Sequence, residues 1–189
     1  GARLAHATLF VIDPIDGTVS FMKQKPEWTI AAAIVHDRRP IAACVYNPVT
    51  EEFYAAASGG GATLNGAPIR ASARGELEGC RMIAPKGMLE HPSWARPWPA
   101  MHIETRGSLA YRLALVAEGK FDAMLGLSTK HDWDIAAADL IVHEAGGIAT
   151  THDGATLHYN GPQPHQPSIV AAGPMLHALL IERVRSIRL

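Results

Sequence analysis

Two aspartates three positions apart could bind a metal ion. They lie in the hexapeptide DPIDGT, residues 13–18, directly after the apolar run 8–12. Hard divalent cations bind carboxylate and carbonyl oxygens, and proline restricts the backbone, so Asp13, the Ile15 carbonyl and Asp16 can converge on a small volume. The alternative interpretation of these residues is an ordinary Asp-Pro turn whose acids are solvated.

The two residues after this pair of acids could hold a phosphate. Gly17 has no Cβ, so a phosphate can approach its backbone closely. If a helix begins here, the free N–H groups of Gly17 and Thr18 face that anion. The hexapeptide therefore predicts an oxygen-rich cation site next to an anion site.

A third carboxylate occurs at a predicted helix start. Asp132-Trp133-Asp134 precedes the apolar, alanine-rich run 135–138. This order places Asp134 in the first helical turn, where the helix dipole favours a carboxylate and keeps it ionised. The alternative interpretation is structural, with Asp132 as the N-cap and Asp134 complementing the dipole.

The elements that must position these acids follow from the apolar pattern. Apolar runs separated by short polar turns predict an antiparallel meander, with strands at 8–12, 28–36, 41–46 and 52–57. Proline is expected to end the first strand at Asp13-Pro14. The second half alternates helical spacing with short apolar runs, which predicts helices at 108–120, 133–144 and 175–184 and strands at 121–125 and 169–172. This order predicts a layered α+β fold, with an antiparallel-sheet part at 1–84 and an α/β part at 85–189.

The composition narrows the class of protein. With 48% apolar and 19% charged residues among 189, the chain can bury a sizeable core, and disorder is not expected. The net charge of −1 gives no long-range attraction to nucleic acid, and the apolar run 30–35 is far shorter than the roughly 20 residues of a membrane helix. We recognise no signal peptide, and the two cysteines, Cys44 and Cys80, are too few for a disulfide framework. We therefore expect a cytoplasmic protein that binds neither nucleic acid nor membrane.

Three segments resemble the inositol monophosphatase family. Residues 10–18, FVIDPIDGT, resemble its first signature, and residues 133–147, from WDIAAA to EAGG, resemble its second. Between them, residues 107–119 are similar to the helix on the substrate side. Two long signatures in the family's order are far more specific than a lone short motif, and the resemblance covers nearly the whole chain.

The resemblance implies a fold and a reaction. The expected fold is the layered α/β sandwich of the inositol monophosphatase and fructose-1,6-bisphosphatase type. The expected activity is Mg²⁺-dependent, Li⁺-sensitive hydrolysis of a small phosphate monoester by metal-activated water, in a homodimer. Paired cations suit this reaction because they clamp the attacking and leaving oxygens and neutralise developing charge.

The resemblance also implies roles for single residues. Asp13 would bridge two metal ions, the Ile15 carbonyl would bind the first ion, and Asp16 and Asp134 would bind the second. Asp13 and Thr18 are the expected catalytic residues, since the Thr18 hydroxyl would help orient the attacking water. The expected substrate-binding residues are Asp16, Gly17, Thr18, Ser108 and His131. Ser108 and the loop 128–131 would border the leaving group.

The chain departs from the family's pattern at its start. The family has an upstream Gly-Glu-Glu motif and another upstream aspartate, whereas none of the twelve residues before Asp13 is acidic. We therefore expect a fold that is incomplete at the N-terminus. We also expect weak Mg²⁺ binding and little turnover from the 189-residue chain.

The leaving group of the substrate is the least constrained part of this interpretation. Inositol monophosphate is the preferred substrate. The alternative is a 3′(2′),5′-bisphosphate nucleotide, because Glu27-Trp28-Thr29 is similar to that branch and no glutamate stands near Gly126 or Leu127. An alternative of another class is a catalytically incomplete member of the family with a structural or partner-binding role.

Overall fold

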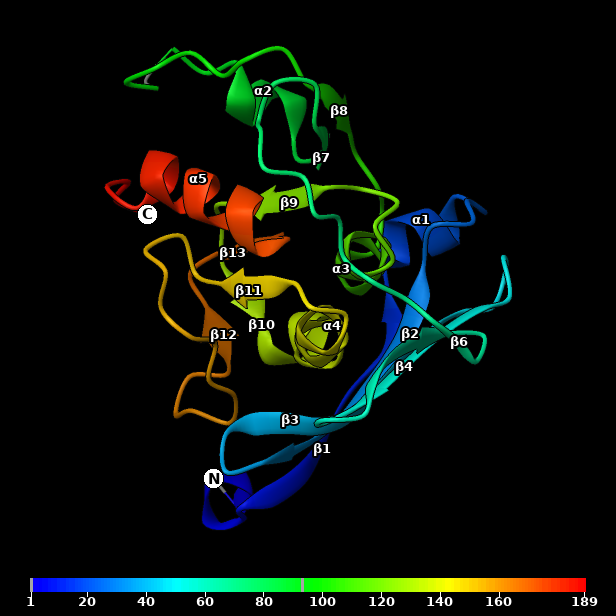
Figure 1. Ribbon diagram of the computed structural model, residues 1–189. Coiled ribbons are helices and arrows are strands. Elements are labelled where there is room, and N and C mark those ends of the chain that lie inside the picture. Colours follow the sequence, from blue (N-terminus) through cyan, green and yellow to red (C-terminus); the bar gives the residue numbers. More distant parts are fainter. Residues whose placement is uncertain (1, 93) are drawn as a thin grey trace.

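A long antiparallel sheet forms one layer of the molecule. The computed structural model describes residues 2–92 and 94–189, and its first sheet has the strand order β1-β2-β3-β4-β5-β6 (Figure 1). After a 3-10 turn at Ala2–Ala5, the strands are β1 (Thr8–Asp16), β2 (Thr29–His36), β3 (Arg39–Asn47), β4 (Glu52–Ala57), β5 (Gly61–Leu64) and β6 (Ala67–Pro68). Every neighbouring pair is antiparallel. The predicted meander is therefore confirmed.

A second, mixed sheet forms another layer. Its order is β11-β13-β9-β7-β8, in which β7 pairs in parallel with both β8 and β9 while the other pairs are antiparallel. These strands are β7 (Arg81–Ile83), β8 (His102–Glu104), β9 (Ala123–Gly126), β11 (Ile148–Thr150) and β13 (Ile169–Ala172). A short ladder of β10 (Lys130–His131) and β12 (His165–Gln166) stands apart from both sheets.

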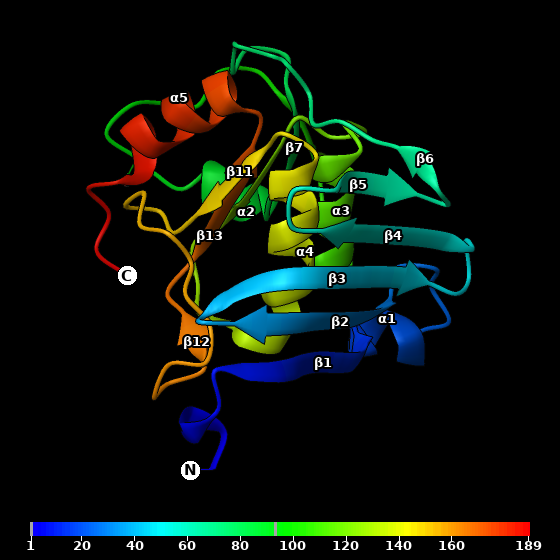
Figure 2. The same cartoon turned by 60° about the horizontal axis from the view of Figure 1, so that its bottom comes forward.

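Helices lie between the two sheets and outside them. The helices are α1 (Thr18–Met22), α2 (Lys86–Leu89), α3 (Leu109–Ala117), α4 (Asp132–Glu144) and α5 (Pro174–Val184). Of these, α3 and α4 fill the space between the sheets. Figure 2 shows the six-stranded sheet in front, with α3 and α4 behind it. In Figure 1, α5 lies on the other side of the second sheet. This arrangement confirms the predicted layered α/β sandwich.

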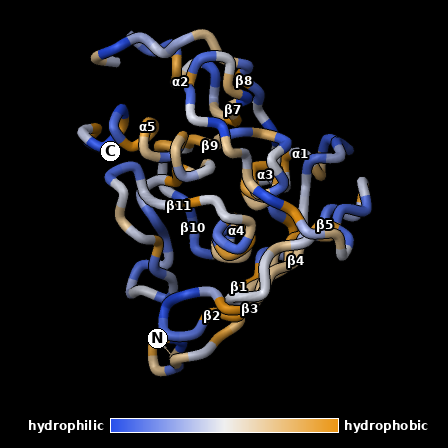
Figure 3. The backbone as a smooth tube through the Cα atoms, viewed as in Figure 1, coloured by the Kyte–Doolittle hydropathy of each residue, from blue (hydrophilic) through white to orange (hydrophobic). Residues whose placement is uncertain are grey.

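The apolar pattern explains why these layers pack. Alternate residues of β2 are buried, among them Ala31, Ala33 and Val35, and this face meets α3 and α4 in the larger core cluster. All nine residues of α3 except Arg112 are buried, as expected for a helix enclosed between two layers. Figure 3 shows hydrophobic residues along α3, α4 and the adjoining strands. The core therefore sits between the sheets, and a smaller cluster joins the second sheet to α5.

The predicted end of the first strand is wrong. β1 does not stop at Asp13-Pro14 but continues to Asp16, with a register irregularity between Asp13 and Asp16. Because β1 lies at the edge of the sheet, the missing N–H of Pro14 costs no ladder hydrogen bond on its open side. The proline therefore distorts the strand without ending it.

The remaining expectations about organisation differ in their outcome. The three predicted helices correspond to α3, α4 and α5, within a few residues at each end. The parallel pairing of β7 with β8 and β9 was not predicted, because strands of three or four residues carry little periodicity. The division into 1–84 and 85–189 stays a prediction. Among the described residues, no helix has the length and apolar character needed to cross a membrane.

Candidate active site

Three carboxylates from distant parts of the chain meet at one point. Asp13 and Asp16 come from the end of β1, and Asp134 comes from the first turn of α4. One oxygen atom of each side chain lies within 4.8 Å of the others. Asp16 is buried, whereas Asp13 and Asp134 are half-buried. The structure therefore brings together the three acids that the sequence singles out.

The distortion of β1 explains how two acids three positions apart share one site. In a regular strand, successive side chains alternate between the faces, so positions 13 and 16 would point to opposite sides. Here Asp13 pairs with Ala31 and Asp16 with Thr29, with a shifted register between them. The Asp13 carboxylate also accepts a hydrogen bond of 3.0 Å from the Ile15 N–H. The irregularity places both carboxylates on the same side of β1, at its C-terminal end.

Asp16 is held by the start of α3. Its Oδ2 accepts hydrogen bonds from the Ser108 hydroxyl at 2.5 Å and from the Ala110 N–H at 2.6 Å. The same hydroxyl caps α3 by accepting from the Tyr111 N–H at 3.0 Å, and it lies 2.8 Å from the Thr29 hydroxyl. Ser108 is fully buried. In this structure Ser108 orients a carboxylate, and its expected contact with substrate stays a prediction.

The pKa values of Asp16 and Asp13 are raised, because burial and the neighbouring carboxylates disfavour the charged forms of these side chains. Burial raises the pKa of Asp16 to about 6, against the lowering effect of its bonds to Ser108 and Ala110, and the charges of Asp13 and Asp134 raise it further. Burial also raises the pKa of Asp13, to which the charge of Asp134 adds. Among the described residues, no lysine, arginine or histidine forms an ion pair with these acids. Oxygen donors with unpaired negative charge fit a hard divalent cation such as Mg²⁺.

Gly17 occupies a position that only glycine fits. Its φ is +87°, and a Cβ there would come within 2.8 Å of the Glu27 carbonyl oxygen and 3.0 Å of the Ser108 nitrogen. Gly17 is also the N-cap of α1, and exposed Thr18 begins that helix. Both residues thus lie directly beside Asp16. Their expected contact with phosphate stays a prediction.

Asp134 caps its own helix while it faces the cluster. Its Oδ2 accepts a hydrogen bond of 3.0 Å from the His131 N–H, and His131 is the N-cap. The alternative role of Asp132 as the N-cap is wrong, because its carboxylate instead accepts from the Asn160 N–H at 2.9 Å. The exposed His131 ring stacks on Trp133 at 4.5 Å. His131 therefore stands at the rim of the site, where its expected contact with substrate stays a prediction.

Two cationic residues near the cluster were not named as site residues from the sequence, although their segments were expected on the substrate side. Arg112 lies four residues after Ser108 on α3, and Lys130 is the first residue of β10, directly before α4. Burial lowers the pKa of both residues, whereas the charge of Asp16 raises that of Arg112 and the charge of Asp134 raises that of Lys130. The sequence signal was the resemblance of their segments, 107–119 and 128–131, to the family's substrate side, and it did not single out either residue.

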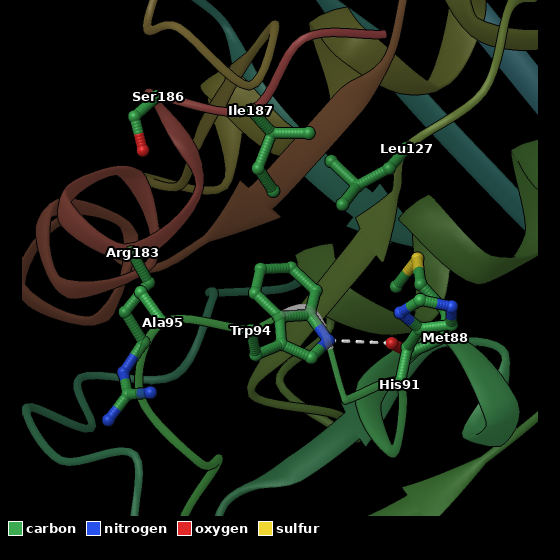
Figure 4. A pocket seen from close by; sticks show the side chains of 8 residues that line it. All are labelled: Met88, His91, Trp94, Ala95, Leu127, Arg183, Ser186 and Ile187. Carbon is green, nitrogen blue, oxygen red and sulfur yellow. Dashed lines mark hydrogen bonds between the residues drawn. The ribbon is translucent and has the colours of Figure 1, made fainter.

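A separate apolar hollow lies outside the carboxylate cluster. It has a volume of about 460 Å³ and is lined by residues that include Met88, Trp94, Leu127 and Ile187 (Figure 4). The Trp94 Nε1–H donates a hydrogen bond of 2.7 Å to the Met88 carbonyl, drawn as a dashed line in Figure 4. This hollow includes none of the three acids, so it does not form part of the candidate site.

Comparison with known proteins settles the family. The sequence profile described as "Inositol monophosphatase family" matches residues 1–189. The chain belongs to the inositol monophosphatase family. Membership confirms the resemblance of the two signatures and the fold expected from it.

Relatives of this inositol monophosphatase family member include both curated proteins and solved structures. Nus factor SuhB of Vibrio cholerae is 33% identical over 184 residues, which cover 93% of this chain and 67% of the relative. SuhB of Bartonella henselae has a TM-score of 0.81 at 28% identity, covering 95% of this chain and 73% of that one. SaIMPase-II with 2′AMP bound has a TM-score of 0.83 at 25% identity (96% and 71% covered), and with inositol monophosphate bound 0.81 at 26% (95% and 71%). The chain spans 57% to 67% of the length of the curated relatives it matches.

Proposed function

We propose that the carboxylate cluster binds Mg²⁺ and that the protein hydrolyses a small phosphate monoester with metal-activated water. The observation that carries this proposal is the convergence of three carboxylate oxygens within 4.8 Å at the end of β1 and the start of α4. Membership in the inositol monophosphatase family supports it. Asp13, Asp16, Asp134 and the Ile15 carbonyl are the proposed ligands. Bound divalent cations lower the pKa of water and neutralise the charge that develops on the phosphoryl group.

The chain's own residues prepare the site in specific ways. Ser108 and the Ala110 N–H fix the Asp16 carboxylate, and the His131 N–H fixes that of Asp134. A carboxylate held in one orientation loses little conformational entropy when it binds a cation. The preorganisation of both acids is therefore part of the proposed mechanism.

The phosphate is proposed to lie against the start of α1. The N–H groups of Gly17 and Thr18 orient it, and the Thr18 hydroxyl orients the attacking water. As the water oxygen bonds to phosphorus, the bond from phosphorus to the leaving oxygen breaks, and the leaving alcohol takes up a proton. The exposure of Thr18 leaves this side open to water.

The substrate class differs between the two candidates only in the leaving group. Inositol monophosphate is the first candidate and a bisphosphate nucleotide the second. Structures of SaIMPase-II hold 2′AMP in one case and inositol monophosphate in another, so likeness to it supports a phosphate monoester without selecting the leaving group. The proposed homodimer and cytoplasmic location rest on the family resemblance.

Mg²⁺ titration and phosphate release from myo-inositol 1-phosphate test the proposal, both measured on the full-length protein because little turnover is expected from the 189-residue chain alone. Asp134→Asn should bind Mg²⁺ much more weakly and release little phosphate, while its circular dichroism matches the parent. Asp153→Asn, an exposed aspartate outside the cluster, is the matched control and should behave like the parent. Equal Mg²⁺ binding by parent and Asp134→Asn would contradict the metal assignment. Bound Mg²⁺ without phosphate release from any monoester would favour the non-catalytic alternative.

A further inference from the structure

We propose that the apolar hollow beside α5 binds a small organic acid, whose apolar body fills the hollow and whose single carboxylate pairs with Arg183. The hollow includes none of the three acids of the cluster, so this proposal does not rest on the proposed function. Its volume of about 460 Å³ lies within the range of about 300 to 1,000 Å³ that is typical of small-molecule sites. A medium-chain or aromatic monocarboxylate is therefore the expected class of ligand.

Three segments that are distant in the sequence form the walls of the hollow. One wall comes from α2 and the proline-rich segment after it, one from Leu127 directly after β9, and one from the end of α5 and the tail. Figure 4 shows Leu127 and Ile187 on one side of the Trp94 indole and Met88 on another. These four side chains pack against the smaller core cluster but are only half-buried. An apolar ligand removes more of their surface from water, which favours binding.

Hydrogen bonds fix two of these walls before any ligand binds. The Trp94 Nε1–H donates to the Met88 carbonyl at 2.7 Å, so the indole is held against α2. The Ile187 carbonyl lies 3.1 Å from Nε2 of buried His152, and the Ile187 N–H donates to the Val184 carbonyl at 3.0 Å. A site that is already formed loses less conformational entropy when it binds a ligand.

Two arginines tie the segment after α2 to α5. The Arg183 Nη1 donates to the Pro97 carbonyl at 3.1 Å, and its guanidinium lies over the Trp98 ring, 5.0 Å from the centroid. In the opposite direction, the Arg96 Nη2 lies 3.0 Å from the Glu182 Oε1. These contacts hold the two walls together and place the Arg183 side chain at the edge of the hollow (Figure 4).

The charges around the hollow favour a singly charged anion at Arg183. Glu90 and Glu182 already have basic partners, because they lie 3.6 Å from Lys86 and 3.0 Å from Arg96. Within residues 2–92 and 94–189, Arg183 has no carboxylate at ion-pair distance, and its Nε and Nη2 have no hydrogen-bond acceptor. A guanidinium binds a carboxylate with two parallel bonds. The neighbouring Glu182 would repel a doubly charged phosphate more strongly than a carboxylate.

Binding of 4-phenylbutyrate to the full-length protein in EDTA tests the proposal, with 4-phenylbutanamide as the uncharged ligand of the same shape. Calorimetry should show that the acid binds at least about tenfold more tightly than the amide, as expected for a hydrogen bond between charged groups. Arg183→Gln should abolish this difference and leave binding of the amide unchanged. Arg185→Gln, at an exposed position on the same helix end that does not line the hollow, is the matched control and should keep the difference.

A second variant tests whether the ligand occupies the hollow itself. Ser186 is exposed and lines the hollow, so the phenyl ring of Ser186→Phe should fill part of the space and weaken both ligands at least about tenfold, while circular dichroism matches the parent. In NMR spectra of the parent, the acid should shift the indole N–H signal that is absent from Trp94→Phe.

Three outcomes would overturn the proposal, and none of them requires turnover. The first is equal binding of acid and amide by the parent, and the second is a Trp94 signal that stays in place when the acid binds. The third is a parent that binds neither ligand and an oligomeric state, measured by sedimentation, that changes in Ser186→Phe. That result would show that a second copy of the chain covers the hollow instead of a small molecule.

Discussion

Replacing Asp16 by asparagine should stabilise the metal-free chain at neutral pH. The ordinary pKa of an aspartate is 3.8, and burial raises that of Asp16 to about 6. Ionising this group therefore costs about 3 kcal/mol more in the folded chain than in the unfolded chain. Asparagine carries no charge, and its carbonyl oxygen can still accept from Ser108 and Ala110. The variant avoids most of that cost.

The sign of the pH dependence follows from the raised pKa. The folded chain holds the proton of Asp16 more tightly than the unfolded chain, so its contribution to stability is fully present below pH 3.8. That contribution is lost as the pH rises through about 6. Urea unfolding in EDTA should show Asp16→Asn about 2 to 3 kcal/mol more stable than the parent at pH 7. The two proteins should be nearly equal at pH 4.

Adding Mg²⁺ should narrow or reverse this difference. A cation that binds only the folded parent stabilises it by mass action, and the variant lacks the charge to bind it. Asp122→Asn is the control of opposite sign, because the Arg81 side chain helps hold the pKa of Asp122 below its ordinary value, so this change should destabilise at pH 7. The reasoning is refuted if Asp16→Asn in EDTA is no more stable than the parent. It is also refuted if Mg²⁺ stabilises both proteins equally.

Three further outcomes are expected. Ser108→Ala should cost about 2 to 4 kcal/mol in urea unfolding, because it removes the α3 cap and the bond to Asp16 and leaves the buried Thr29 hydroxyl without that partner; a loss below about 1 kcal/mol would contradict this. Burial lowers the pKa of His177 to about 4, so the parent should lose up to about 3 kcal/mol as the pH falls from 6.5 to 4. The stability of His177→Gln should fall clearly less over that range. Identical pH profiles of stability for parent and variant would refute the attribution of this loss to His177. Li⁺ should inhibit Mg²⁺-dependent phosphate release at saturating Mg²⁺, and rates that stay constant across a Li⁺ titration would count against the family assignment of the metal site.

The large elements could be predicted from sequence because each carries its own periodicity. The strands β2 to β4 and the helices α3 to α5 show period-two or helical apolar patterns over six or more residues. The end of β1 could not be predicted in this way. Whether a proline ends a strand or only distorts it depends on whether that strand lies at a sheet edge, and a local pattern contains no information about the edge.

The candidate site shows the same division between local and tertiary information. The resemblance of two signatures to a family identified Asp13, Asp16 and Asp134, and the structure brings them together. Arg112 and Lys130 belong to neither signature, and they lie 18 positions apart with β9 between them. The hydroxyl of Ser108 was expected near substrate, whereas its bond to Asp16 depends on the packing of α3 against β1. Roles that depend on contacts between elements required the fold.

The proposed dual use of the Asp134 carboxylate, as helix cap and as metal ligand, would tie cation binding to the rigidity of a whole helix. One oxygen of this side chain caps α4 through the His131 N–H, and α4 packs against five strands of the first sheet. A cation that restrains the carboxylate also restrains the cap, so fraying of the first helical turn becomes rarer. Amide hydrogen exchange along α4 would register the arrival of the ion far from where it binds. The exchange rates of the α4 amides would therefore report whether the carboxylate cluster at the N-terminal end of this helix holds a cation.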